Sequence, residues 1–287
     1  MPVIVRSWFL GRVGYNRALR LQKQLVEINT RSNNKCPAYT ILMVEHSPVY
    51  TIGLRSEDYS EKQQEELQNH GAQFIRIARG GLITYHGPGQ LMAYPIINLR
   101  GSELVGKGLR WYVEALEQAG FETCEAFKPD TFQKGSKLFP DKTAATGVWL
   151  NQHNKIMSIG RLNFGDYGIS FLVHATRSVA YHGVGLNCSS EPLKWFDRIV
   201  PCGLTNCKMT SLEAVTEAKL TPDDVAPILS EHLFGNLFKH KDDLECTYGD
   251  FLTEDDSLPW EKISQFILQD ADLRTKKLPS QETPPPA

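Results

Sequence analysis

The sequence predicts an α+β fold in which helices flank a mixed, mainly antiparallel sheet. Short apolar runs of strand length, such as 40–46 and 91–99, are interspersed with longer amphipathic segments, such as 15–31. The two kinds of segment do not alternate in the regular strand–helix–strand order that is typical of a parallel sheet. At 287 residues, with 41% hydrophobic and 22% charged residues, the chain is long enough to bury a sizeable core.

Strands are expected where apolar residues form short runs between turn-forming residues. In chain order these runs are 2–10, 40–46, 73–78, 91–99, 147–150, 155–160 and 178–188. The second run ends before Pro48. The polar segment 151–154 separates the fifth run from the sixth, which predicts a hairpin.

Helices are expected where apolar residues recur at helical spacing and a capping residue marks an end. These segments are 15–31, 56–70, 108–121, 210–215 and 221–240. Gly71 and Gly120 are predicted to end the second and third helices, because glycine readily adopts the left-handed conformation found there. Thr210 or Ser211 is expected to cap the fourth helix and Thr221 the fifth.

Residues 1–240 are expected to form one domain, because no convincing boundary is visible before residue 205. Residues 241–287 are then a C-terminal extension. Its last segment, 275–287, is rich in proline and lacks aromatic side chains, which predicts disorder.

The charge balance excludes some classes of partner. Lys and Arg total 31 against 33 for Asp and Glu, giving a net charge of -2. Proteins that bind nucleic acid through its phosphates usually carry an excess of basic residues, so no nucleic-acid partner is expected. No apolar run approaches the roughly 20 residues that span a bilayer, so no membrane partner is expected either.

The six cysteines are scattered and include no CxxC pair, so neither a metal site nor a disulfide scaffold is expected. This usage indicates a reducing compartment. The first 26 residues contain no Asp or Glu but five basic residues, which suits a mitochondrial import signal. An ordinary strand followed by an amphipathic helix explains the same residues equally well, and the two interpretations can coexist.

The segment RGGLITYHGPGQ (79–90) is the first candidate for a binding site. Gly80 and Gly81 allow the backbone to approach a ligand closely, and His86 and Gln90 add hydrogen-bonding groups. The spacing matches neither the dinucleotide-binding GxGxxG motif nor the Walker motif. A single histidine in such a place is more often structural than catalytic.

Two further segments carry candidate chemistry. Cys202 lies in a Pro-Cys-Gly turn, which can display a thiol but is equally compatible with a packed loop. Lys155 begins an apolar strand, where a solvated lysine would be ordinary. Residues 182–185 repeat the pattern of a histidine beside a glycine seen in 79–90, which suggests facing walls of one cleft or a coincidence of turns.

Taken together, these segments resemble the lipoyl(octanoyl) transferase family, the protein-acylating branch of the biotin/lipoate protein ligase-like fold. The matching motifs, in order, are EHSPVYTIGLR (45–55), RGGLITYHGPGQLMAYPIINL (79–99), GVWLNQHNKIMSIG (147–160), YHGVGLN (181–187) and WFDRIVPCGL (195–204). The resemblance covers roughly residues 40–212. It implies that 1–240 is the catalytic domain of an octanoyltransferase, with the mitochondrial form as the expected member.

The resemblance implies an acyltransferase that uses a cysteine nucleophile. Cys202 corresponds to the residue that accepts an octanoyl group from octanoyl-acyl carrier protein as a thioester. Lys155 corresponds to the lysine that lowers the thiol pKa, because a nearby ammonium stabilises a thiolate. The implied acceptor is a specific lysine on a lipoyl domain of a 2-oxo-acid dehydrogenase or of the glycine cleavage H protein. Since one thioester replaces another before the amide forms, neither ATP nor another cofactor is needed.

The resemblance also assigns the residues that line the acyl chain. They are Arg79, Gly80, Gly81, Leu82, Ile83, Thr84, Tyr85, His86, Ser158, Ile159, Gly160, Gly183, Val184 and Gly185. Glycines let an extended acyl chain lie against the backbone, and backbone N–H groups near Cys202 can stabilise a tetrahedral oxyanion. Gly185 stands where the family usually has alanine.

Residues 161–172 have no counterpart in the family pattern. A surface loop of this length is tolerated, because closure entropy grows slowly with loop length. Alternatively, the insertion disrupts the strand that holds Ser158–Gly160 and marks an inactive variant that only binds lipoyl domains, or an alternative gene product. The sequence is also compatible with an ATP-dependent lipoate or biotin ligase and with an acyl-thioesterase.

The expected partners are acidic proteins, which favours a local basic rim around the site. Arg177, Lys194, Arg198 and Lys208 are the candidates, although ordinary solvated side chains explain them equally well. The substrates and the acid-poor N-terminus favour the mitochondrial matrix, and a monomer is expected. A bacterial protein with the same motifs would be cytoplasmic.

Overall fold

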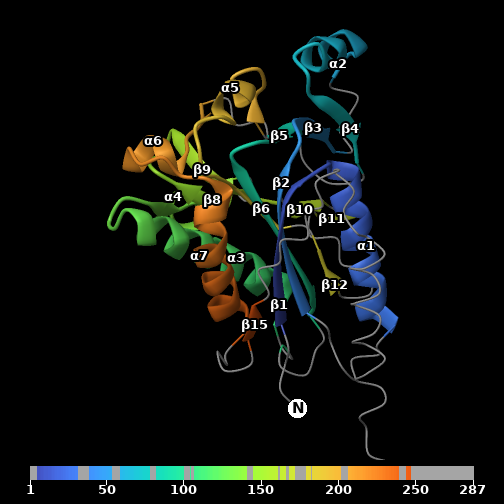
Figure 1. Cartoon of the computed structure of the whole chain (residues 1–287), viewed down its shortest axis with the longest axis vertical. Helices are drawn as coiled ribbons and strands as arrows, with labels where there is room; N and C mark the ends of the chain where they lie inside the picture. Colours follow the sequence, from blue (N-terminus) through green and yellow to red (C-terminus); the bar gives the residue numbers. More distant parts are fainter. Residues whose placement is uncertain are drawn as a thin grey trace, which may run out of the picture. The chain divides into compact units, whose positions relative to one another are not determined.

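The structure is a computed structural model (Figure 1). It describes residues 5–31, 39–53, 59–77, 82–99, 104, 107–140, 145–160, 162–165, 168–171, 179–181, 183–201, 206–238 and 244–246. Side chains are described for all of these except residues 28, 30, 31, 162–165, 168–171 and 244–246. The described residues belong to one compact unit, Met1–Gly249. Most of the predicted extension 241–287 lies outside them, and that prediction stays untested.

A mixed ten-stranded sheet forms the centre of the fold. Its main path runs through β15 (Leu244–Cys246), β1 (Val5–Val13), β2 (Tyr39–His46), β6 (Gln90–Asn98), β13 (Val184–Asn187), β9 (Asn154–Ile159), β8 (Gly147–Trp149) and β7 (Gln133–Lys134), with β12 (Val179–Ala180) beside β6 and β14 (Lys208–Met209) beside β9. The β15–β1, β1–β2 and β14–β9 pairs are parallel. The other pairs are antiparallel, which confirms the predicted mixed and mainly antiparallel sheet.

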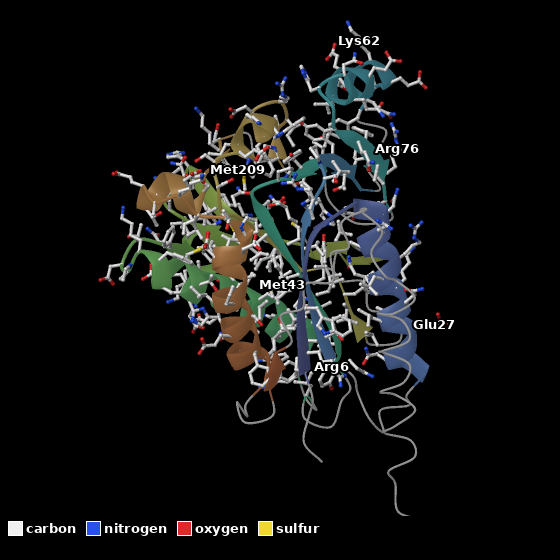
Figure 2. The ribbon with its side chains drawn as sticks, in the orientation of Figure 1. Arg6, Glu27, Met43, Lys62, Arg76 and Met209 are labelled. Carbon is white, nitrogen blue, oxygen red and sulfur yellow. The ribbon has the colours of Figure 1, made fainter. Side chains whose placement is uncertain are left out.

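Helices cover both faces of this sheet. The helices of the described residues are α1 (Tyr15–Arg31), α2 (Glu61–Gln68), α3 (Leu109–Phe127), α4 (Gly135–Leu138), α5 (Leu193–Phe196), α6 (Leu212–Thr216) and α7 (Pro222–Leu237). α1 packs on β2 and β6, whereas α3 and α7 pack on each other and on strands of the sheet. Figure 1 shows α1 on one side of the sheet and α3 with α7 on the other. Met43, labelled in Figure 2, is fully buried in the core beneath α3 and α7.

The predicted caps explain where several helices begin. Ser211 is the N-cap of α6, and its hydroxyl accepts a hydrogen bond from the Ala214 N–H at 3.2 Å. Thr221 is the N-cap of α7, where Asp224 completes a capping box. Both predictions are confirmed. The helices begin at these residues because a cap satisfies backbone N–H groups that have no partner within the helix.

The prediction that Gly120 ends the third helix is wrong. α3 continues through Gly120 to Phe127. A Cβ atom at Gly120 would lie 2.1 Å from the Met157 methyl carbon and 2.2 Å from its sulfur. Glycine is therefore needed here because the helix lies close against β9, and not because the chain turns.

A second, three-stranded sheet was only partly predicted. β3 (Val49–Ile52) lies between β4 (Gln73–Arg76) and β5 (Thr84–His86). β3 was missed because its four residues are buried on both faces and show no alternation. α2 contacts β4, and the exposed Lys62 of α2 points outward in Figure 2.

The insertion forms a β-hairpin of its own. β10 (Leu162–Gly165) pairs with β11 (Gly168–Phe171) in an antiparallel two-stranded sheet. β9, which precedes it, keeps its pairing with β13, since Ser158 lies opposite Gly185 and Ile159 opposite Val184. In the described residues, the hairpin therefore leaves the strand containing Ser158 and Ile159 in place.

A buried carboxylate joins α3 to two neighbouring segments. Glu117 is 1% exposed, and its Oε1 accepts hydrogen bonds from the Gly147 N–H at 2.8 Å and the Ser136 N–H at 3.1 Å. Its Oε2 accepts from the Ser136 hydroxyl. The charge is thus balanced by several donors, as a buried carboxylate requires.

We expect Glu117→Ala to lower the free energy of unfolding by about 3 kcal/mol, because it leaves the buried Gly147 N–H and the partly buried Ser136 N–H without their acceptor. Urea denaturation monitored by circular dichroism measures this. The matched control is Glu114→Ala on the same helix. Glu114 makes an exposed pair with Arg110 at 3.0 Å, so its loss should cost less than about 0.5 kcal/mol. Equal losses for the two variants would contradict the assignment.

Candidate active site

Lys155, on β9, is almost completely buried, with 2% exposure. Its Nζ donates to the Thr146 carbonyl oxygen at 2.9 Å and lies 5.1 Å from the centroid of the Trp149 ring. The interpretation of Lys155 as an ordinary solvated lysine is therefore wrong. An ammonium is expensive to bury, so its place in the interior requires partners and suggests a chemical role.

The backbone beside Lys155 can pass only at a glycine. Gly147 has a φ of +140°, in a region that other residues rarely adopt. A Cβ atom there would lie 2.2 Å from the Met157 carbonyl oxygen and 2.8 Å from Lys155 Cε. Glu117 holds the Gly147 N–H at 2.8 Å. The buried carboxylate thereby fixes the strand against which the lysine side chain lies.

The segment that follows Cys202 in sequence runs along the start of β9. The Lys208 N–H donates to the His153 carbonyl oxygen at 2.7 Å, and the Thr210 N–H donates to the Lys155 carbonyl oxygen at 2.8 Å. β14 thus lies parallel to β9, with Met209 opposite Lys155. Cys202 itself lies outside the described residues, as do Arg79, Gly80 and Gly81.

The segment that precedes Cys202 packs on the glycine-rich stretch. The Trp195 ring of α5 stacks on Tyr85 with ring centroids 5.2 Å apart and planes 7° apart. The Phe196 ring contacts Tyr85 edge-on, and the Tyr50 hydroxyl donates to the Trp195 carbonyl oxygen at 2.9 Å. Tyr85 and Ile83 are fully buried, so these two predicted lining residues belong to the core of the small sheet.

The remaining predicted lining residues fall into two groups. Leu82, just before β5, and Thr84 and His86 within it are partly exposed. The second group consists of Ser158, Ile159, Gly160, Gly183, Val184 and Gly185. Its members are neighbours in the main sheet, because β9 pairs with β13 and the Gly160 N–H donates to the Gly183 carbonyl oxygen at 3.2 Å. Their role in acyl binding stays a prediction.

A line of polar side chains, partly exposed at His86 and buried at Gln90 and Asn187, joins these parts of the site. His86 Nδ1 lies 2.9 Å from Gln90 Oε1, and Gln90 Nε2 donates to Asn187 Oδ1 at 2.8 Å. Asn187 Nδ2 then donates to the Thr210 carbonyl oxygen at 2.9 Å. Since the Thr210 N–H donates to the Lys155 carbonyl oxygen, the line connects His86 to the backbone of Lys155. Asn187 was not predicted as a functional residue, although it lies shortly after two glycines, near the end of the predicted strand 178–188.

Two other thiols are poor nucleophiles. Burial raises the pKa of both Cys124 and Cys188 above its ordinary value. A thiol reacts as the thiolate, so neither side chain is suited to attack a thioester near neutral pH. Cys207 is partly exposed, and its thiol donates to the Lys208 carbonyl oxygen at 3.5 Å.

The comparisons with known proteins agree with this arrangement. The sequence matches the lipoyl protein ligase A/B catalytic domain over residues 14–234. The chain belongs to this family. The match covers the main sheet from α1 into α7, including Lys155, and it also spans the segment that contains Cys202.

Several curated members of the lipoyl protein ligase A/B family are similar over most of their length. A mitochondrial protein of Danio rerio named octanoyl-acyl-carrier-protein:protein N-octanoyltransferase is 40% identical, covering 79% of this chain and 89% of its own. The mitochondrial octanoyltransferase of Arabidopsis thaliana is 35% identical, covering 78% and 84%. An octanoyltransferase of the bacterium Acidobacterium capsulatum is 36% identical, covering 88% and 97%.

Solved structures show the same fold at low identity. A lipoate-protein ligase A bound with ATP has a TM-score of 0.59 at 14% identity, covering 92% of this chain and 94% of its own. A lipoate protein ligase from Thermoplasma acidophilum has a TM-score of 0.56 at 14% identity, covering 93% and 92%. The expected lipoate ligase-like fold is therefore confirmed.

Within the described residues, every helix is too short or too polar to cross a membrane.

His46 is a buried residue of the site region that the sequence did not single out. Its Nδ1 donates to the Val13 carbonyl oxygen and its Nε2 accepts from the Tyr94 hydroxyl, both at 2.7 Å. The ring also packs on Tyr15 and on His86, with centroids 5.3 and 6.1 Å away. Burial lowers the pKa of His46 from 6.5 to about 4, which keeps the ring neutral at physiological pH.

This shift predicts acid sensitivity. The folded-state pKa of His46 is below its unfolded value, so the unfolded chain binds the proton more readily. The stabilisation by neutral His46 is complete above pH 6.5. As the pH falls towards 4, the free energy of unfolding decreases by about 3 kcal/mol in total.

Urea midpoints measured across this interval for the parent and His46→Asn test the prediction. The difference between the two proteins should shrink as the pH falls, because carboxylates titrate alike in both. His70→Asn, at an exposed position, is the control and should follow the parent. A difference in urea midpoint between the parent and His46→Asn that stays constant with pH would contradict the prediction.

Proposed function

We propose that the chain transfers an octanoyl group from octanoyl-acyl carrier protein to a specific lysine of a lipoyl domain, through a thioester on Cys202. The observation that carries this proposal is the buried Lys155, held where the segment following Cys202 pairs with β9. Relatives at 35–40% identity that are named octanoyltransferases support the same reaction. Residues 1–240 form the catalytic domain in this proposal.

The reaction has two halves. In the first, the Cys202 thiolate attacks the octanoyl thioester, and the leaving thiolate of the carrier takes a proton from the Lys155 ammonium. In the second, the acceptor amine attacks the acyl-enzyme and Cys202 leaves as thiolate. Because the acyl group arrives already activated as a thioester, no adenylate and no ATP are required.

The acyl chain is proposed to lie along the predicted lining residues. Leu82, partly exposed just before β5, supplies apolar surface, while Gly183 and Gly185 on the β13 side leave room beside the backbone. An apolar surface measures chain length only coarsely, because each CH₂ contributes about 0.8 kcal/mol. We therefore expect selectivity among neighbouring chain lengths to be modest.

The proposed partners are octanoyl-acyl carrier protein as donor, and lipoyl domains of 2-oxo-acid dehydrogenases and of the glycine cleavage H protein as acceptors. The names of eukaryotic relatives include the word mitochondrial, which supports action in mitochondria. Within them, the matrix is the proposed compartment and a monomer the proposed state. Of the predicted basic rim, Lys194 lies 3.8 Å from Glu191 and Arg198 donates to His70 at 2.7 Å. Lys208 is exposed, and Arg177 lies outside the described residues.

The main alternative is an ATP-dependent ligase, favoured by the fold that the chain shares with a lipoate-protein ligase A. A ligase activates a free acid as an adenylate and needs no cysteine nucleophile. Transfer from free octanoate that requires ATP would therefore support the ligase.

Intact-protein mass spectrometry tests the proposal directly. After mixing with octanoyl-acyl carrier protein without ATP, the parent should gain one octanoyl group and lose it when apo lipoyl domain is added. Cys202→Ser should gain none, whereas the matched control Cys207→Ser should behave as the parent. An adduct that persists in Cys202→Ser would identify another nucleophile. If the folded parent forms no adduct, removal of hairpin 161–172 should restore it; otherwise the proposal fails.

Lys155→Met should raise the pKa of the Cys202 thiol, because the ammonium that stabilises the thiolate is lost. We expect alkylation of Cys202 by iodoacetamide at pH 7 to slow about tenfold or more. Peptide mapping of the labelled protein measures this rate across pH. Lys208→Met, on the neighbouring β14, is the control and should leave the rate within about twofold of the parent, since its ammonium is exposed. An unchanged pH profile in Lys155→Met would remove Lys155 from the proposed role.

A further inference from the structure

The line of buried amides fixes where the proton of His86 sits. A backbone carbonyl oxygen only accepts hydrogen bonds, so the amide nitrogen of Asn187 must face Thr210. Asn187 Oδ1 then faces Gln90, which must present its nitrogen there at 2.8 Å. Gln90 is left with its oxygen towards His86 Nδ1 at 2.9 Å. An amide oxygen also only accepts, so Nδ1 carries a hydrogen.

Burial makes this assignment costly to reverse. Gln90 is 3% exposed and Asn187 is fully buried, so water cannot rescue a flipped amide. Flipping either one would set like atoms against each other and leave buried groups unsatisfied. The backbone supports the pair, because Gln90 and Asn187 lie opposite each other in neighbouring strands β6 and β13. The His86 ring is further held by stacking on Tyr15, with planes 9° apart.

The role of His86 inferred below rests on the proposed function. In that reaction, one proton has no acceptor among the groups named so far. The acceptor lysine enters as an ammonium and ends as an amide N–H, so it gives up two protons. The neutral Lys155 left by the first half-reaction takes one and becomes an ammonium again. Meanwhile the thioester C–S bond breaks, the amide C–N bond forms, and Cys202 leaves as thiolate. The second proton must go to another base before it reaches solvent.

We propose that Gln90 and Asn187 are positioning residues that keep the proton of the neutral His86 ring on Nδ1, so that its Nε2 takes this second proton. His86, on β5 of the smaller sheet, lies beside Gln90 at the start of β6, and the two amides connect it through Thr210 to the Lys155 carbonyl oxygen on β9. General-base catalysis by histidine contributes about 100-fold or more when the acceptor nitrogen is correctly presented.

The neighbouring histidine cannot take the same part. Both ring nitrogens of His46 are engaged with Val13 and Tyr94, and the ring is fully buried. Burial holds the pKa of His46 at about 4, so the ring remains neutral and places no competing cation beside His86. The carboxylate of Glu45, the residue before His46, is also engaged. It pairs with Arg12 at 2.5 Å and accepts a hydrogen bond from the Gly89 N–H.

The first test measures the tautomer in the free full-length protein. Long-range ¹H–¹⁵N spectra of ¹⁵N-histidine protein, with His86→Gln used for assignment, distinguish a proton on Nδ1 from one on Nε2. We expect Nδ1–H in the parent, and a shift towards Nε2–H in Gln90→Met. The control is Asn29→Leu, which removes a buried amide on α1 and should leave the His86 signals unchanged. An Nε2–H ring in the parent would overturn the proposal whatever the activity.

The second test separates the two half-reactions by single-turnover mass spectrometry. Gln90→Met should slow discharge of the octanoyl-enzyme onto apo lipoyl domain about tenfold or more, while changing formation of the acyl-enzyme less than about threefold. A general loss of structure would slow both halves, and equal slowing of both contradicts the proposed proton step. If neither the parent nor the protein lacking hairpin 161–172 forms an acyl-enzyme, the proposed function itself fails, and the tautomer measurement still decides the positioning role.

Discussion

The arrangement of the site depends on the burial of the Lys155 ammonium. A charge in the interior is tolerated only where dipoles and rings replace water, and here the Thr146 carbonyl and the Trp149 ring do so. The strand carrying these groups must approach closely, which requires glycine at 147. Glu117 in turn anchors Gly147 from α3. A helix outside the sheet thus contributes to the position of the lysine, and stability and chemistry share the same contacts.

Two neighbouring networks of side chains join the other parts of the site to one another. The stacked rings of Tyr85 and Trp195 join the glycine-rich stretch to the segment before Cys202, and the amides of Gln90 and Asn187 join it to the segment after Cys202. The first network is apolar and the second polar. The lipoate ligase-like fold supports different acyl chemistries because such side chains, and not the scaffold, decide the reaction.

Local signals in the sequence predicted the elements that are stabilised locally. The α6 and α7 caps and the hairpin of β8 and β9 were predicted because the residues that form them are adjacent in the chain. The misjudged features have distant causes. Gly120 has the composition of a helix end, but it serves as a contact surface for Met157 on a strand 37 positions away. β3 is recognisable only through its pairing with β4 and β5.

The sequence by itself determined the fold class, the family motifs and the identities of Cys202 and Lys155 as candidate chemical groups, because these depend on residue type and order along the chain. The tertiary structure decided that Lys155 is buried and which way the amides of Gln90 and Asn187 point. Burial and hydrogen-bond direction depend on strands brought together from residues 90, 155, 187 and 210. No local pattern encodes those distances, since each side chain is placed by partners far away in the chain.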